Sequence, residues 1–164
     1  MDNLTLDDLD LRILNALQAD ASISNLELSR RVHASAPTCL RRVRALTEAG
    51  VIARQIAIID PSKLGPTLTA VVEVSLDRQT AEDHDAFESY ICGEPAVTQC
   101  YRVSPGPDFV VIAEVRDMAE YDELARRLFK SSANIRNVRT FFSTRRAKFE
   151  ANARIPPIRS NTSH

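Results

Sequence analysis

The stretch SAPTCLRRVRALTEAGVI, residues 35–52, decides how the first third of the chain folds and which surface it presents. Ser35 is a residue type that favours helix N-caps, Pro37 suits the first helical turn, and Gly50 is a typical helix stop. Apolar side chains recur between them at i, i+4 and i+7, which predicts one buried stripe: Cys39, Val43 and Leu46.

The opposite face of this predicted helix is basic. Residues 30–54 hold six arginines and one acidic residue, a local net charge of +5 in a chain of net charge −1. A guanidinium fork suits phosphate oxygens and the O6/N7 edge of guanine, so we predict contact with double-stranded DNA. A protein-docking face, or a surface pair between Arg44 and Glu48, is the alternative. The candidate DNA-binding residues are the cap, the first turn and the basic face: Ser35, Pro37, Thr38, Arg41, Arg42 and Arg44.

Two further helices are expected before this one. Thr5 with Asp8, and Ser24 with Glu27, have the spacing of capping boxes ahead of apolar residues at helical intervals. Three short helices joined by tight turns are typical of a helix-turn-helix. Arg30 and Arg31 end the second helix, where they could simply complement its dipole.

The second half alternates between strand and helix patterns. Period-2 or continuous apolar runs predict strands at residues 67–76, 96–103, 109–115 and 137–145. Helical spacing predicts helices at residues 80–95 and 118–130. The order βαββαβ is that of a ferredoxin-like, or split βαβ, arrangement.

Composition excludes several classes of protein. No apolar run in the 164 residues approaches the ~20 needed to cross a bilayer, and the acidic start lacks the features of a signal peptide, so we expect a cytoplasmic protein without membrane association. The three cysteines form no CxxC motif, and the histidines lie at no metal-ligand spacing from them, which predicts reduced thiols and no metal site. We expect no enzyme and no cofactor, because there is neither a nucleophile–base arrangement nor a phosphate-binding glycine loop.

Read in order, three segments resemble the Lrp/AsnC family of transcription regulators: LDDLDLRILNALQAD at 6–20, ISNLELSRRV at 23–32, and the stretch at 35–52. The resemblance extends over roughly residues 4–150. It implies an α+β protein with a winged helix-turn-helix DNA-binding domain, a hinge strand, and a ferredoxin-like ligand-sensing domain. The expected divisions are 1–53 for the DNA-binding domain, 54–65 for the hinge strand or linker, 66–150 for the effector-binding and oligomerisation domain, and 151–164 for an irregular tail.

The resemblance also implies an amino-acid effector site. In the family, a glycine followed by an aspartate closes this site at a contact between dimers. Here Pro105 stands at the usual glycine position and Gly106 follows it, and on spacing alone SPGP reads as a rigid hairpin connection. The residues that match effector positions lie on the turn, the next helix and the last strand: Val103, Ser104, Gly106, Asp108, Met118, Phe141, Phe142 and Ser143.

One face of the expected sheet has no helix to cover it. We predict that Phe141, Phe142 and the apolar alternates of other strands form a homodimer interface there, with assembly to a higher oligomer such as the octamer that the family implies. The alternative places these aromatic side chains in the core of one subunit. Arg102 stands where the family usually has an apolar residue, and we expect its partner on a neighbouring subunit rather than on the ligand.

The expected function is sequence-specific transcription regulation, with an oligomer whose state or geometry responds to a small amino acid. The alternative is an architectural DNA-binding protein that has no effector.

Overall fold

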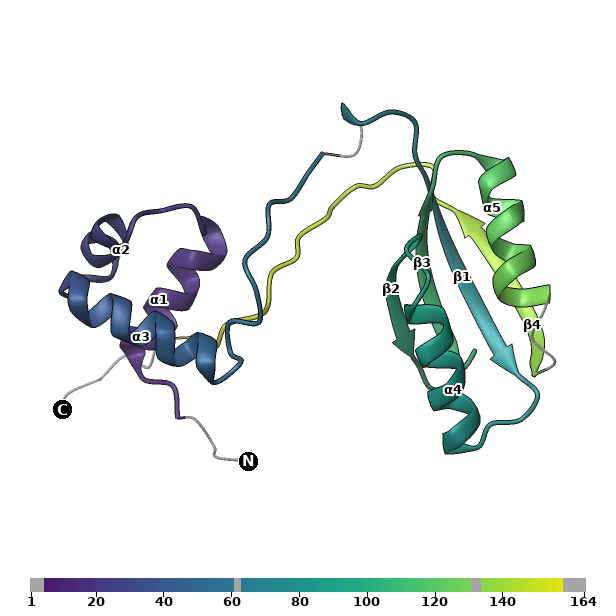
Figure 1. Cartoon of the computed structure of the whole chain (residues 1–164), viewed down its shortest axis with the longest axis horizontal. Coiled ribbons are helices and arrows are strands. Elements are labelled where there is room, and N and C mark those ends of the chain that lie inside the picture. Colours follow the sequence, from purple (N-terminus) through teal and green to yellow (C-terminus); the bar gives the residue numbers. More distant parts are fainter. Residues whose placement is uncertain (1–4, 61–62, 131–133, 158–164) are drawn as a thin grey trace. The chain divides into compact units, whose positions relative to one another are not determined.

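The computed structural model describes residues 5–60, 63–130 and 134–157 (Figure 1). The chain divides into an N-terminal unit, residues 1–58 with 149–164, and a C-terminal unit, residues 59–148. The elements in chain order are α1 (Asp8–Ala19), α2 (Asn25–Val32), α3 (Ala36–Glu48), β1 (Leu68–Leu76), α4 (Ala81–Cys92), β2 (Val97–Arg102), β3 (Phe109–Val115), α5 (Met118–Ala125), the π-helical turn η2 (Arg126–Lys130) and β4 (Ile135–Phe142).

Helices α1, α2 and α3 pack around one small core. The predicted stripe of α3 is confirmed, because Cys39 and Leu46 are buried and Val43 packs against them. Burial of apolar side chains stabilises this core by about 25 cal/mol per Å² removed from water. Its fully buried members come from each of the three helices: Ile13, Leu28, Val32, Cys39 and Leu46.

Helix α1 begins later than the sequence predicts. Asp7, not Thr5, is the N-cap: its carboxylate accepts the Asp10 backbone N–H at 2.9 Å, and the Asp7 backbone N–H donates to the Asp10 carboxylate at 3.1 Å. A capping box is therefore present, but it is shifted by two residues from the expected Thr5–Asp8 pair. Because both of its side chains are carboxylates, this box also carries negative charge at the start of α1.

Arg42 of α3 neutralises that charge. Its guanidinium lies 2.7 Å from the Asp7 carboxylate and 3.2 Å from the Asp10 carboxylate, and the Asp10 side chain is only 8 % exposed. The Asp10 backbone N–H and the Arg42 guanidinium hold the pKa of Asp7 below its ordinary value, against the upward effect of burial. The contact joins α3 to the start of α1, so it fixes which face of α3 points outward.

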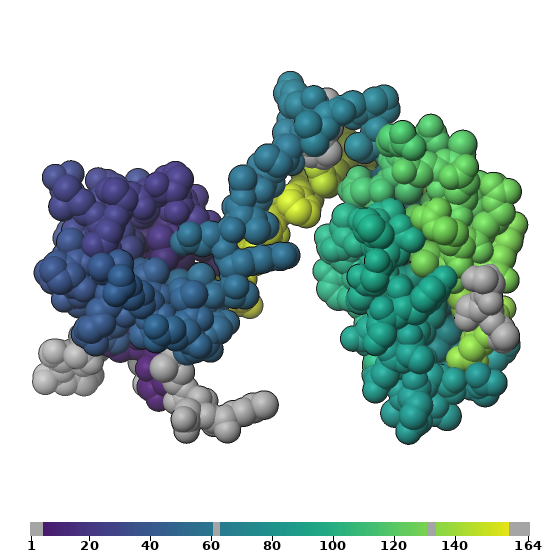
Figure 2. Space-filling view, in the orientation of Figure 1, coloured from purple at the N-terminus to yellow at the C-terminus, as the bar shows by residue number. Residues whose placement is uncertain are grey.

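The described residues of the C-terminal unit form a four-stranded antiparallel sheet in the order β2-β3-β1-β4. This is the predicted ferredoxin-like arrangement. Helices α4 and α5 lie on the same face of the sheet, where Phe87 of α4 and Leu124 of α5 join one core with the buried side chains of β1 and β3. Figure 1 shows the two helices on one side of the sheet, and the teal to green atoms of this unit are drawn in full in Figure 2.

The other face of the sheet carries no helix. Strand residues alternate between faces, so Val72 and Val111 are buried under the helices, whereas their neighbours Val71 and Ile112 face the other way and are half-buried. Tyr101 is 52 % exposed and Phe141 47 % exposed on this uncovered face. Phe142, in contrast, points into the core, where it packs edge-on against Tyr121 with ring centroids 4.9 Å apart.

The placement of Phe142 corrects the prediction that both phenylalanines contribute to an interface. Two consecutive residues of one strand cannot share a face, so Phe141 alone belongs to the uncovered face and Phe142 takes the alternative core position.

Two described segments outside the helices and strands follow α3 and β4. Residues 53–60 form no strand, so the described residues show neither the expected hinge strand nor a β-wing after α3; residues 61 and 62 of the expected hinge lie outside the described residues. Residues 151–157 are irregular, yet Ala153 is bound to Gln18 of α1 by two hydrogen bonds. The Gln18 side-chain N–H donates to the Ala153 carbonyl, and the Ala153 backbone N–H donates to the Gln18 side-chain oxygen, both at 3.0 Å. Residues 158–164 of the expected tail lie outside the described part.

No helix in the part of the chain that the structure describes is long and apolar enough to cross a membrane.

We predict that Arg42→Ala loosens the N-terminal unit. The substitution leaves the buried Asp10 carboxylate without its cation, which should lower the local free energy of unfolding by about 1–3 kcal/mol. Hydrogen exchange measured by mass spectrometry should show faster exchange in peptides from α1 and α3. Peptides from the sheet should be unchanged.

Arg44→Ala, on the exposed face of the same helix, is the matched control and should leave exchange within experimental error. Equal protection of α1 and α3 in Arg42→Ala and in the wild type would contradict the anchoring role.

Candidate functional site

The exposed face of α3 is the first candidate site. The Ser35 hydroxyl caps the helix by accepting the Thr38 backbone N–H at 3.3 Å. The hydroxyl oxygens of Ser35 and Thr38 lie 2.8 Å apart. Pro37 follows in the first turn, where its missing N–H costs no helical hydrogen bond. The cap therefore sets the start of α3, where Ser35 and Pro37 are exposed at the surface.

Arg41 and Arg44 extend this face toward solvent. Both side chains are exposed, on the side of α3 opposite to Cys39 and Leu46. Within the described ranges neither makes an ion pair, so the predicted alternative of an Arg44–Glu48 pair does not form. Two unneutralised guanidinium groups one helical turn apart can bind two neighbouring anionic groups.

Three of the other four arginines in residues 30–54 have acidic partners, and Arg54 makes no ion pair with a described residue. Arg42 is engaged by Asp7 and Asp10, as described above. Arg30 and Arg31 at the end of α2 both approach the Glu27 carboxylate, at 3.8 and 3.2 Å. On α3 itself, Arg41 and Arg44 are therefore the arginines without an acidic partner among the described residues.

The turn between β2 and β3, residues 103–108, is the second candidate site. The Val103 N–H donates to the Asp108 carbonyl at 3.0 Å, and the Asp108 N–H donates to the Val74 carbonyl of β1 at 2.9 Å. Gly106 has φ +129°, a conformation that residues with a Cβ rarely adopt, which explains a glycine at this point of the turn. The turn is thus closed on itself and attached to β1.

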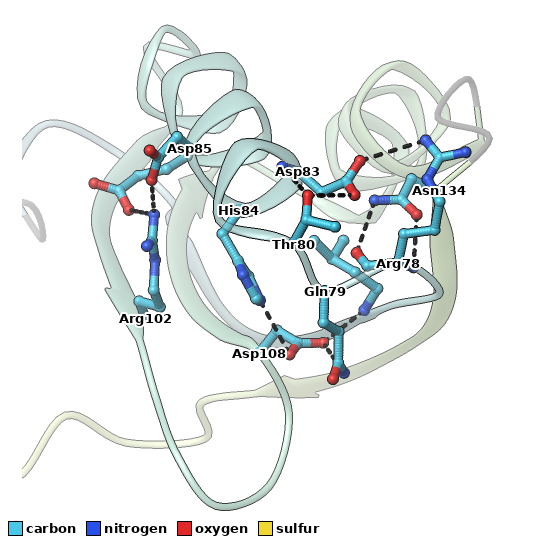
Figure 3. A network of polar contacts seen from close by, with 11 residues as sticks. Arg78, Gln79, Thr80, Asp83, His84, Asp85, Arg102, Asp108 and Asn134 are labelled. Carbon is cyan, nitrogen blue, oxygen red and sulfur yellow. Dashed lines mark hydrogen bonds and ion pairs between the residues drawn. The ribbon is translucent and has the colours of Figure 1, made fainter.

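The Asp108 carboxylate is the centre of a polar network (Figure 3). It accepts the backbone N–H of Leu76 at 2.7 Å and the side-chain amide of Gln79 at 3.1 Å, and it lies 3.3 Å from Nε2 of His84 on α4. Because a carboxylate only accepts, His84 must carry its proton on Nε2 to make this bond.

These hydrogen bonds determine the ionisation of Asp108. Burial pushes its pKa up, but the bonds from Leu76, His84 and Gln79 outweigh burial, and the pKa of Asp108 lies below its ordinary value. An aspartate in such a turn can fix the loop by accepting hydrogen bonds, or it can bind the ammonium group of a ligand. The contacts of Asp108 support the first role.

The remaining predicted effector residues lie at the far end of the sheet. Ser143, just after β4, donates its N–H to the Thr69 carbonyl, and Phe141 pairs with Val71, whereas the 103–108 turn attaches at Val74. Met118 begins α5 and is 54 % exposed. It follows Val115 by three residues, and because Val115 pairs with Leu68, Met118 lies near the same end of the sheet as Ser143. Thr69 and Val74 are five residues apart, which is about 17 Å along a strand.

One chain therefore does not bring the predicted effector residues together. Val103, Ser104, Gly106 and Asp108 gather at one end of the sheet, and Met118, Phe141, Phe142 and Ser143 gather at the other. Near the second end, a polar cavity of about 240 Å³ includes Ser143; its lining is Asp60, Thr67, Thr69, Glu114, Ser143, Thr144, Arg145 and Arg146.

Arg102 has its partners within its own subunit, which corrects the expectation of a partner on a neighbouring one. Its guanidinium lies 2.6 Å from Asp85 and 2.8 Å from Glu88, both on α4, and 5.8 Å from the centre of the Phe109 ring (Figure 3). These two acids raise the pKa of Arg102, the Asp85 hydrogen bond contributing most. Among the described residues, no group of three or more metal-ligating side chains comes together.

Several of these contacts were not predicted from the sequence. Asp7 and Asp10 belong to the segment 6–20 that resembles the family, but their contact with Arg42 was not predicted, and His84 and Gln79 were not singled out at all. Nothing in the local pattern marks them, because each meets its partner across 24 or more residues of chain.

Comparison with known proteins agrees with the division into two functional parts. Residues 6–53 match a family model described as winged helix-turn-helix DNA-binding, and residues 69–152 match one described as the Lrp/AsnC ligand binding domain. A leucine-responsive regulatory protein of Rhizobium meliloti is 37 % identical over 143 residues, covering 87 % of this chain and 92 % of that protein.

Solved structures show the same likeness. An AsnC family transcriptional regulator from Agrobacterium tumefaciens is 30 % identical, with a TM-score of 0.84, covering 91 % of this chain and 97 % of that one. A transcriptional regulator of Neisseria meningitidis, solved as a complex with L-Met, is 27 % identical, with a TM-score of 0.83, covering 92 % and 97 %.

We predict that Asp108→Asn destabilises the C-terminal unit in a pH-dependent way. At pH 7 the loss of the ionised acceptor should lower the free energy of unfolding by about 1–2 kcal/mol. Because the folded pKa is lowered, the contribution of Asp108 is complete above its unfolded pKa, about 3.9, and disappears as the pH falls through the folded value.

Urea denaturation at pH 7 and at pH 3, followed by tyrosine signals, measures this, since the tyrosines lie at 90, 101 and 121 in the C-terminal unit. The difference in the free energy of unfolding between variant and wild type should be smaller at pH 3 than at pH 7. Asp122→Asn is the control, because Asp122 forms an exposed ion pair with Arg126. This substitution should change the free energy of unfolding little at either pH. An equal difference in the free energy of unfolding at both pH values would contradict this role of Asp108.

Proposed function

The chain belongs to the Lrp/AsnC family of transcriptional regulators, and we propose that it reads DNA through the exposed face of α3. It is a DNA-binding regulator with an amino-acid-sensing domain, and not an enzyme. The observation that carries the proposal is the pair Arg41 and Arg44, exposed and without ionic partners among the described residues, on the last helix of a helix-turn-helix.

The proposed DNA contacts follow from the position of each group on α3. Ser35, Pro37 and Thr38 lie at the start of the helix, where N–H groups and the helix dipole favour a phosphate. Arg41 and Arg44 lie farther along and supply the forks that suit base edges or phosphates. Arg42 is assigned to holding α3 against α1 rather than to contact with DNA.

The architectural alternative is not favoured, because the C-terminal half matches a ligand-binding domain rather than a second DNA-binding module. A protein-docking role for α3 is likewise not favoured, because the matched N-terminal model is a DNA-binding one. We propose a cytoplasmic location, since a regulator must share a compartment with its DNA.

We propose a homodimer formed through the uncovered face of the sheet. Tyr101 and Phe141 are exposed there beside the half-buried Val71, Val110 and Ile112, and an apolar surface of this kind is typical of an interaction site. A dimer also suits DNA reading, since paired recognition helices can occupy two half-sites.

We propose that the effector binds where two chains meet. Its candidate residues lie at opposite ends of one sheet, so a single pocket would combine the 103–108 turn of one chain with Met118, Phe141 and Ser143 of another. Phe142 faces the core, and its contribution would be to position Phe141. Asp108, bound by its own chain, would hold the turn in shape for the ligand.

A contact between two different ends of the subunit is heterologous, and such contacts generate a closed ring when the rotation between successive copies closes. This supports assembly of dimers into a higher oligomer such as an octamer. A ligand at that contact shifts the assembly only by binding one arrangement better than another. The segment 54–65 would act as the hinge through which such a shift reaches the DNA-binding unit.

We predict that Arg41→Ala and Arg44→Ala weaken DNA binding without unfolding the chain. A lost base contact should cost about 1–3 kcal/mol of affinity, whereas a lost phosphate contact should reduce the salt slope by about one unit per charge. Binding isotherms over a range of salt concentrations, on duplexes selected from a random pool by the wild-type protein, separate the two cases.

Arg126→Ala, an exposed arginine of the C-terminal unit, is the matched control and should change neither affinity nor slope. Wild-type affinity and slope in the Arg41/Arg44 double variant would exclude this face of α3 as the DNA-binding surface.

A further inference from the structure

Two of the three cysteines lie on the helix-covered side of the sheet in the C-terminal unit. Cys92 is the last residue of α4, and Cys100 lies within β2, where it packs against the core. Glu88, one helical turn before Cys92, binds Arg102, two residues after Cys100, so the packing of α4 on β2 places the two cysteines near each other. Burial raises the pKa of the Cys100 thiol, and Cys92 is near enough to raise it further. Cys92 is exposed and Cys100 is half-buried, whereas Cys39 is fully buried in the N-terminal unit.

Several contacts hold α4 along β2, which is an edge strand of the sheet. Asp85, Glu88 and Cys92 are spaced to lie along one side of α4. The two acids bind Arg102 of β2, as Figure 3 shows for Asp85, and Cys100 lies two residues before Arg102 on the same strand. Phe87 and Ile91 on the neighbouring side of α4 are buried in the core. Both cysteines therefore belong to two elements that pack against each other, and neither lies on a loop.

We propose that Cys92 and Cys100 form a reversible disulfide within one chain when the protein meets hydrogen peroxide. The proposal rests on the packing of α4 against β2 and does not depend on the identity of the DNA site or the effector.

The chemistry balances with peroxide as the oxidant. The Cys92 sulfur attacks one peroxide oxygen, the O–O bond breaks, and the products are a sulfenic acid and water. The Cys100 sulfur then attacks the Cys92 sulfur, the S–O bond breaks, and the departing hydroxyl leaves as water with the Cys100 proton. In sum, two thiols are oxidised to a disulfide while one peroxide is reduced to two waters.

The surroundings assign the order of the two steps. Cys92 is exposed, so it is the thiol that peroxide reaches first. Burial raises the pKa of Cys100 to about 11, with further upward effects from Cys92 and Glu88, so Cys100 is a poor first nucleophile. Burial also raises the pKa of the Cys39 thiol, which lies in the core and should be spared.

The bond would fix the edge strand that leads into the 103–108 turn. β2 pairs on one side only, with β3, and the turn begins directly after Arg102. A covalent link at Cys100 adds a second attachment to α4 beside the Arg102 ion pairs.

The test uses the full-length, reduced protein treated with a few equivalents of hydrogen peroxide. Titratable thiols should fall from three to one, and the intact mass should drop by two hydrogen atoms. A non-reducing peptide map should join the peptides that contain Cys92 and Cys100, and dithiothreitol should restore all three thiols.

Two variants define the roles. Cys92→Ser should lose the disulfide and keep its remaining thiols under the same treatment. Cys100→Ala should stop at the sulfenic acid of Cys92, which dimedone traps. Both variants should bind DNA and unfold as the reduced wild type does, which shows that they are folded. Oxygen addition at Cys92 of the wild type without a crosslink, a disulfide between two chains, or oxidation of Cys39 first would each overturn the proposal.

Discussion

The alternation of side chains along β-strands is the constraint on which the C-terminal half of this protein depends. Because α4 and α5 cover the same face of the sheet, every second residue along the central strands β1 and β3 is buried in the core. The residues between them are left on a face that the subunit does not cover. Phe141 and Phe142 show the consequence most directly, since adjacent aromatic residues serve opposite faces. The uncovered face is the structural reason to propose a dimer.

Carboxylates position both candidate sites. Asp7 and Asp10 bind Arg42, so α3 is held while Arg41 and Arg44 point to solvent. Asp108 binds Leu76, Gln79 and His84, so the 103–108 turn is held while Ser104 and Gly106 are exposed. In both places a buried or half-buried acid accepts bonds from a second element, and the neighbouring groups are left free for a ligand.

Sequence periodicity was sufficient for the elements and their order but not for the contacts between them. The Cys39–Val43–Leu46 stripe and the βαββαβ order depend on local spacing, and both are present in the structure. The partners of Arg42 and Arg102 lie 32 and 14 or more residues away, and no periodic pattern encodes which distant acid an arginine will meet. The Thr5 cap was wrong because Asp7, two residues later, offers a carboxylate to both the helix start and Arg42. The contact between Ala153 and Gln18 could not be predicted either. It consists of hydrogen bonds between one side-chain amide and the backbone, and such bonds leave no signal in the composition.

The central claim is that this regulator senses amino acids through contacts between its own chains. Sedimentation velocity of the wild-type protein, without ligand and with each protein amino acid in turn, tests it most directly. The account predicts a species of at least twice the chain mass of 18.3 kDa, with at least one amino acid that changes the distribution of assemblies. A monomer of 18.3 kDa at every concentration, unaffected by any amino acid, would contradict it.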